Sequence, residues 1–79
     1  MNPTVTKVQP ERNYFLTLHF SNGEIRRMDV KPYLDKGIFR ELKTLSSFNS
    51  VNTDGLGIVW NNEASLSPYT VYSESIPVS

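Results

Sequence analysis

The sequence predicts an α+β fold, a small sheet with a central β-hairpin and short helical turns packed on one face. Residues 14–20 alternate apolar and polar side chains, which is the pattern of a strand with one buried face. An Asn-Gly turn signal at residues 22–23 follows directly and leads into a second strand-like segment, residues 24–30. The helical patterns are short and bounded by proline or glycine, so no long helix is expected.

The length of the chain limits its core. It has 79 residues, and we expect a single α+β domain spanning residues 1–79. A chain this short buries only about 60% of its unfolded surface. It contains no cysteine, so no disulfide can stabilise that core. Association with a second subunit would bury further apolar surface, and a homodimer is therefore expected.

The N-terminal half is expected to form three strands. The first covers residues 5–8 and is closed by Pro10. In the hairpin that comes next, a two-residue turn would place charged residues opposite core leucines. A three-residue loop with Gly23 in the left-handed region instead pairs Leu16 with Met28, which gathers more apolar side chains on one face. We therefore predict the second register.

The middle of the chain is expected to be helical in short pieces. Pro32 ends the hairpin and begins a single turn, and Gly37 breaks the helix after that turn. Beyond Gly37, apolar residues fall at helical spacing, which predicts a second short helix facing the core. These residues are Ile38, Phe39, Leu42 and Leu45.

The last third is expected to hold a central strand and one capped helix. A strand begins at Val51, and after an Asp-Gly turn the apolar run 58–60 is typical of a strand covered on both faces. Ser67 followed by proline predicts a helix over residues 68–72. The segment 73–79 has the composition of a polar tail.

Charge and hydropathy exclude several classes. Eight basic residues balance eight acidic ones, which gives no preference for nucleic acid or an anionic membrane. No apolar run approaches the roughly 20 residues of a membrane span. The N-terminus lacks the basic-then-apolar pattern of a signal peptide, so we expect a cytoplasmic protein without a membrane partner.

Three segments together resemble a bacterial domain-of-unknown-function family, number 2442 in that naming. They are Leu18-His19-Phe20-Ser21-Asn22-Gly23-Glu24 leading to Asp29-Val30, Tyr33-Leu34-Asp35-Lys36-Gly37-Ile38-Phe39, and Gly57-Ile58-Val59-Trp60 through Leu66, Pro68 and Tyr72. The resemblance implies a compact α+β domain. Some relatives carry an appended helix-turn-helix, and some sit beside small genes that resemble toxin genes.

Catalytic and metal-binding patterns are not found in the sequence. His19 is the only histidine, and no nucleophile motif accompanies it. The acidic residues show no metal-ligand spacing. The glycine-rich stretch 54–57 lacks the lysine and long helix of a phosphate loop, so we interpret it as a turn. We therefore expect no enzyme, no cofactor and no metal.

The function hypothesis is a non-enzymatic protein-interaction module, antitoxin-like by resemblance, with a protein partner. Strand phase turns Phe15, Thr17, Ile25 and Arg27 to the outer side of the hairpin, where they would form an apolar patch with a charged rim. Tyr69 is expected to be exposed on the last helix. These five residues are the predicted interaction residues.

The alternative is a small DNA-binding transcriptional regulator. It would place Arg26, Arg27 and Lys31 on phosphates, and its binding would weaken steeply with salt. The balanced total charge argues against nucleic acid as a partner.

Overall fold

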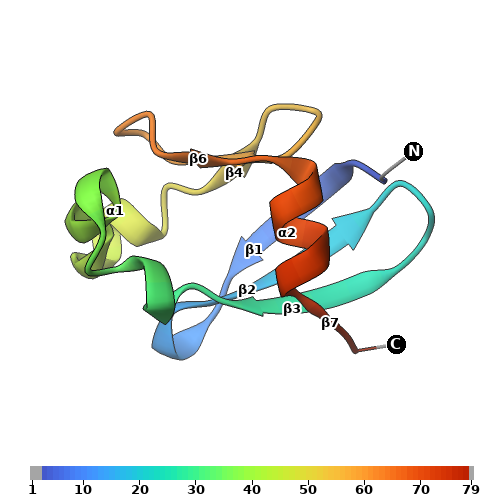
Figure 1. Cartoon of the computed structure of the whole chain (residues 1–79), viewed down its shortest axis with the longest axis horizontal. Helices are drawn as coiled ribbons and strands as arrows, with labels where there is room; N and C mark the ends of the chain where they lie inside the picture. The colour runs from blue at the N-terminus through green and yellow to red at the C-terminus, as the bar shows by residue number, and fades with distance from the viewer. Residues whose placement is uncertain (1–2, 79) are drawn as a thin grey trace.

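Two antiparallel sheets lie one above the other in the computed structural model, which describes residues 3–78 (Figure 1). The first has four strands in the order β1-β2-β3-β7, and the second has three in the order β4-β5-β6. The strands are β1 (Val5–Pro10), β2 (Phe15–Phe20), β3 (Ile25–Asp29), β4 (Asn52–Thr53), β5 (Ile58–Val59), β6 (Ser65–Leu66) and β7 (Ile76–Pro77). The helices are the 3-10 helices η1 (Arg12–Tyr14), η2 (Lys31–Tyr33) and η3 (Gly37–Lys43) and the α-helices α1 (Leu45–Phe48) and α2 (Pro68–Glu74).

The predicted α+β class is confirmed, and the β2–β3 hairpin is central in the four-stranded sheet. Its register is the predicted one, with Leu16 opposite Met28 and Leu18 opposite Arg26. Gly23 has φ +89°, the left-handed conformation that the three-residue loop requires. This register decides which side chains face the core and which face outward.

The core fills the space between the two sheets. Leu16, Leu18 and Met28 project from the four-stranded sheet and are fully buried. From the second sheet, Ile58 and the flanking Trp60 are buried against them. β5 is the middle strand of its sheet, as the apolar run predicted. The indole Nε1 of Trp60 donates to the carbonyl oxygen of Phe48 at 3.0 Å, which satisfies its one buried polar group.

Helix α2 covers the inner side of β3 (Figure 1). Its start is the predicted one, because the Ser67 hydroxyl accepts the backbone N–H of Thr70 at 3.2 Å and Pro68 occupies the first turn. It runs to Glu74, two residues past the predicted end. Val71 anchors its buried face.

The predicted polar tail is wrong for most of its length. Ile76 and Pro77 form β7, which pairs with Arg27 and Arg26 of β3. The backbone N–H of Val78 continues the ladder to Ile25 at 2.9 Å. Residue 79, like residues 1–2, lies outside the described residues. The pairing depends on contacts with residues about 50 positions earlier in the chain, which local polarity does not show.

The helix predicted from apolar spacing in the middle of the chain is also only partly right. Residues 37–43 form the 3-10 helix η3, and α1 follows. Leu42 is buried and Phe39 half-buried, whereas Ile38 is 44% and Leu45 61% exposed. A 3-10 helix has about three residues per turn, so a pattern with a period of 3.6 does not stay on one face. Among residues 3–78 no helix has the length and apolar character to cross a bilayer.

Candidate functional site

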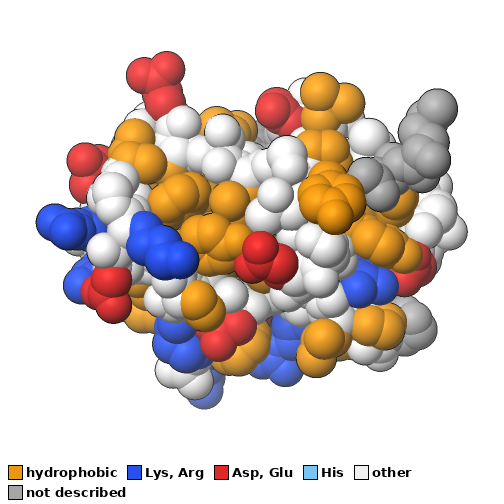
Figure 2. Space-filling model, viewed as in Figure 1, with side chains coloured by type: hydrophobic (Ala, Val, Ile, Leu, Met, Phe, Trp, Pro, Cys, Tyr) orange, Lys and Arg blue, Asp and Glu red, His pale blue; other side chains and the backbone are white. Residues whose placement is uncertain are grey.

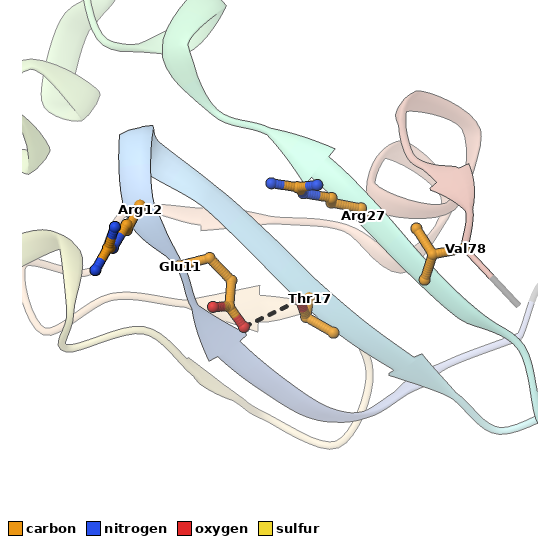
Figure 3. Close-up of a pocket in the computed structure, with 5 residues that line it drawn as sticks. All are labelled: Glu11, Arg12, Thr17, Arg27 and Val78. Carbon is orange, nitrogen blue, oxygen red and sulfur yellow. Dashed lines mark hydrogen bonds between the residues drawn. The ribbon is translucent and has the colours of Figure 1, made fainter.

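One face of the four-stranded sheet is turned away from the core, and we refer to it as the outer face. Figure 3 looks onto it, with α2 and the second sheet behind the strands. The face carries the side chains that alternate with the buried ones, together with two residues of the β1–β2 connection at its border. These residues are Lys7, Gln9, Glu11, Arg12, Phe15, Thr17, His19, Ile25, Arg27, Asp29, Ile76 and Val78. The ammonium group of Lys31, from η2, also lies on this face, over the ring of Phe15.

Strand pairing arranges these side chains in rows across the sheet. Thr17, Arg27 and Ile76 occupy neighbouring positions on β2, β3 and β7. His19 and Ile25 form the next row. Ile76 and Val78 are 65% and 51% exposed, so the β7 end of the face is apolar and open to solvent.

Four of the five predicted interaction residues lie on this face. The structure brings Phe15, Thr17, Ile25 and Arg27 together, as the register implied. Tyr69 is separate from them, because it lies on α2 on the opposite side of the sheet, where it is 63% exposed. Whether any of the five contacts a partner stays a prediction.

Ile76 and Val78 were not among the predicted interaction residues. A signal was present, since two apolar residues flank a proline with a period of two, which is the pattern of a short edge strand. The serines around these residues favoured the interpretation of the segment as a polar tail. The two residues add to the outer face the apolar surface that Phe15 does not supply.

Phe15 lies on the outer face, and two cations pack over its ring. The guanidinium carbon of Arg27 lies 4.4 Å and Lys31 Nζ 4.2 Å from the centre of its ring. Lys31 is held there by Asp29 at 3.0 Å and by the carbonyl oxygen of Asn13 at 2.9 Å. Arg27 is the diagonal neighbour of Phe15 across the ladder, and Lys31 reaches the same ring from the start of η2.

Arg27 makes no salt bridge within residues 3–78. The three salt bridges of that region join Glu24 to Arg26, Asp29 to Lys31 and Asp35 to Lys43. The ring of Phe15 orients the guanidinium group, whose N–H groups stay exposed. This arrangement can donate hydrogen bonds to an external acceptor.

A shallow depression of about 470 Å³ lies beside Arg27 (Figure 3). Glu11, Arg12, Thr17 and Val78 complete its lining. The hydroxyl of Thr17 donates to Glu11 Oε2 at 3.1 Å, which fixes the carboxylate at the border. The depression therefore combines an apolar wall with charged groups of both signs.

Strained backbone shapes the connection at this border. Asn13 and Tyr14 have φ of 59° and 64°, the left-handed region that a bulky residue rarely adopts. Contacts in the core compensate for this strain. The Tyr14 ring packs edge-on against Phe48, and its hydroxyl donates to the Lys43 carbonyl oxygen.

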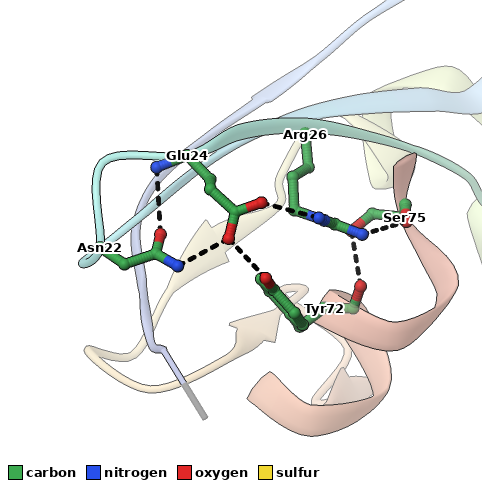
Figure 4. Close-up of polar contacts among 5 residues, drawn as sticks. All are labelled: Asn22, Glu24, Arg26, Tyr72 and Ser75. Atoms are coloured by element: carbon green, nitrogen blue, oxygen red, sulfur yellow. Dashed lines mark hydrogen bonds and ion pairs between the residues drawn. The ribbon is translucent and has the colours of Figure 1, made fainter. Parts of the chain in front are cut away.

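The inner side of the same sheet holds a polar network around Arg26 (Figure 4). Its guanidinium donates to the Ser75 hydroxyl at 2.8 Å, to the Ser75 carbonyl at 2.6 Å and to Glu24 at 2.8 Å. It also stacks 4.2 Å from the centre of the Tyr72 ring. Only 12% of the Arg26 side chain is exposed. Its bonds to Ser75 fix the C-terminal end of α2, and with it β7, against the hairpin.

Hydrogen bonds set the protonation of this network. The Tyr72 hydroxyl donates to Glu24, and with Asn22 and Arg26 it lowers the pKa of the Glu24 carboxyl below its usual range. The same bond raises the pKa of the Tyr72 phenol. A second tyrosine on the inner side, Tyr33, donates to Glu74 of α2 at 2.6 Å. Burial and that bond raise the pKa of Tyr33 to about 12.

His19 and the glycine-rich stretch lie in surroundings that suit structural positions. His19 has Lys7 and Ile25 as its ladder neighbours, and neither offers a carboxylate or hydroxyl partner. The glycine-rich stretch is a turn, because Asp54 Oδ1 accepts the backbone N–H groups of Leu56 and Gly57 at 2.9 Å each. Within residues 3–78, no three His, Cys, Asp or Glu side chains gather as a metal site.

Comparison with known proteins gives one match. A family model described as Protein of unknown function (DUF2442) matches residues 5–77, from the first residue of β1 to the last of β7. The resemblance inferred from the three sequence segments is thereby confirmed. No curated protein and no solved structure matches the chain.

Proposed function

The chain belongs to the DUF2442 family, and we propose that it is a non-enzymatic protein-interaction module that binds a partner protein through the outer face. One observation carries the proposal. The outer face presents Ile76 and Val78, both more than half exposed, beside Arg27, which makes no salt bridge with any residue between 3 and 78. Exposed apolar groups rimmed by polar ones mark interaction surfaces, and arginine is enriched at them.

The antitoxin-like part of the proposal comes from the family, in which some relatives sit beside genes that resemble toxin genes. An interaction domain of this kind needs a stable scaffold and one accessible surface, with no catalytic group. His19, the single histidine, has a cation and an aliphatic residue as neighbours, which suits a solvated surface position better than a general base.

The DNA-binding alternative has weaker support. It required Arg26 on phosphates, and that side chain is enclosed by Glu24, Tyr72 and Ser75. Arg27 and Lys31 remain on the outer face, but a specific DNA complex uses several phosphate contacts. On the side of the molecule seen in Figure 2, acidic and basic side chains are interspersed.

A second copy of the chain is the other candidate for covering the outer face, which would make the protein a homodimer. It would cover Ile76 and Val78 and add burial to a small core. It would also bring together two copies of a face on which cations, among them Arg27 and Lys31, outnumber carboxylates, and this disfavours self-association. We therefore place a distinct protein partner first.

The test is co-expression with the product of the adjacent gene, followed by affinity capture and light scattering for the mass of the complex. The variants Ile76→Asp and Val78→Asp alter the outer face. Leu56→Asp is the matched control, because Leu56 is 58% exposed in the loop between β4 and β5, away from that face.

We expect the two face variants to weaken capture about tenfold or more, the effect of placing a charge in an apolar contact region, and the control to bind normally. Equal capture by all three would refute the proposed surface. A mass of two copies for the unmixed protein would instead identify self-association.

A further inference from the structure

We infer that the segment of the partner that covers the outer face is an acidic amphipathic helix. Its carboxylates would bind Arg27 and Arg12, and its apolar side would rest on Ile25, Ile76 and Val78. This inference rests on the proposed function and specifies the chemistry of the partner.

The charge of the chain is unevenly distributed between its two sides. The outer face carries four cations, Lys7, Arg12, Arg27 and Lys31, and two carboxylates, Glu11 and Asp29. The rest of the chain holds the other four cations and six carboxylates, since the totals are eight and eight. A neutral chain thus presents two excess positive charges on the outer face. That excess favours an acidic partner.

The guanidinium group of Arg27 is preorganised to bind a carboxylate. Stacking on Phe15 at 4.4 Å holds the guanidinium plane in place, so binding restricts fewer side-chain conformations. Asp29, the acidic neighbour on its own strand, is already paired with Lys31 at 3.0 Å. A planar guanidinium with free N–H groups matches a carboxylate through two parallel hydrogen bonds.

The sheet has two edge strands, β1 and β7, and the β7 edge borders the apolar part of the outer face. The Val78 N–H points to β3, so by strand alternation the nitrogen of Pro77 points to the open edge of β7. Proline has no N–H there, and a ladder hydrogen bond that a new strand would need is missing. Next to Ile76 and Val78, covering the face is therefore favoured over adding a strand.

The size of the face suits a helix. β2 has six residues, which span about 20 Å at the usual rise of a strand. A helix of about 13 residues has the same length. Helices are common covers of sheet faces in layered folds. The chain cannot supply this helix from a second copy, because within residues 3–78 its longest helices have seven residues.

The experiment is a selection of binders by the full-length chain from a display library of 15-residue peptides randomised at every position. We expect enriched peptides to place Asp or Glu next to apolar residues at spacings of three and four. An NMR titration of the isotope-labelled chain with the best peptide should shift amides of Thr17, Ile25, Arg27, Ile76 and Val78.

Charge reversal provides the control. Arg27→Glu should weaken the selected acidic peptide about tenfold or more, as expected when an attractive charge pair becomes a repulsive one. It should also select basic peptides from the same library. Arg40→Glu reverses an exposed charge on η3, away from the outer face, and should leave both results unchanged.

Three results would overturn the inference: no enrichment above the blank, enrichment without acidic bias, or enriched peptides with the period of two of a strand. None of them would refute the proposed function, which depends on capture of the adjacent gene product by the unaltered face. A different pair of results would refute the proposed function alone. In that case the face variants and the Leu56→Asp control would capture the adjacent gene product equally well, while the library selection still enriched acidic peptides.

Discussion

Two adjacent arginines on β3 should respond to alanine substitution in opposite ways. Arg26 faces inward and makes three hydrogen bonds through its guanidinium group. Arg27 faces outward and contacts the ring of Phe15. Arg26→Ala should therefore destabilise the fold, whereas Arg27→Ala should leave the fold intact and weaken partner binding.

The magnitudes follow from the contacts. Hydrogen bonds to a charged group contribute about 1.5–3 kcal/mol, and Arg26, whose side chain is 12% exposed, makes three part-buried ones, so we expect a loss of about 3 kcal/mol. A domain of this size has a total free energy of unfolding of about 4–12 kcal/mol. An exposed cation–π contact contributes about 0.5–1 kcal/mol, which is the expected cost of Arg27→Ala.

Urea unfolding followed by tryptophan fluorescence measures both values, because the single tryptophan, Trp60, is 2% exposed and becomes solvated on unfolding. For a denaturant slope of about 1–1.5 kcal/mol per molar, Arg26→Ala should lower the midpoint by about 2–3 M and Arg27→Ala by less than about 1 M. Equal shifts would refute the reasoning. A larger shift for Arg27→Ala than for Arg26→Ala would indicate a register moved by one residue, which exchanges the two faces.

Two further predictions concern a close contact and a titration. A Cβ at Gly57 would lie 2.1 Å from the Leu66 carbonyl oxygen, whereas Gly55 has nothing within 4 Å and a φ of +91°. Gly57→Ala should therefore lower the free energy of unfolding by about 3 kcal/mol or more, because the added methyl group overpacks the site. Gly55→Ala should lower it by about 1–2 kcal/mol, because alanine is strained in the left-handed region. Similar losses for the two variants in urea unfolding would contradict this prediction. The pKa of Tyr33 is raised from 10.0 to about 12 in the folded chain, so its contribution to stability is present below pH 10 and is lost as pH rises toward 12. Tyr33→Phe should flatten the decline of the urea midpoint across that range. An unchanged decline would show that burial and the hydrogen bond to Glu74 do not raise the pKa of Tyr33.

The hairpin could be predicted from the sequence because its determinants are local. Strict alternation on β2 and a glycine in the turn fixed the pairing of Leu16 with Met28 and so identified the outward side chains. The capped start of α2 was equally local, since serine and proline act within one turn. The same register also places Arg27 diagonally across from Phe15, a contact that could have been inferred but was not.

The remainder of the outer face could not be predicted from local patterns. β7 forms because Arg26 binds Ser75 and aligns the following residues with β3, a contact that spans 49 positions. The local signal for β7, two apolar residues that flank a proline, is weak among serines and does not identify β3 as the strand with which β7 pairs. The predicted apolar patch of Phe15, Thr17 and Ile25 therefore lacked Ile76 and Val78, the two large apolar residues of that face that are more than half exposed.

The central claim is that the outer face is the binding surface, and NMR mapping of the isotope-labelled chain with its captured partner tests it most directly. We expect the amides that shift or broaden to lie on the outer face, at Thr17, Ile25, Arg27, Ile76 and Val78. Signals of Tyr69 on α2 should remain in place, because that side chain lies on the opposite side of the sheet. Changes centred on α2, with the outer face unperturbed, would show that the binding surface lies elsewhere.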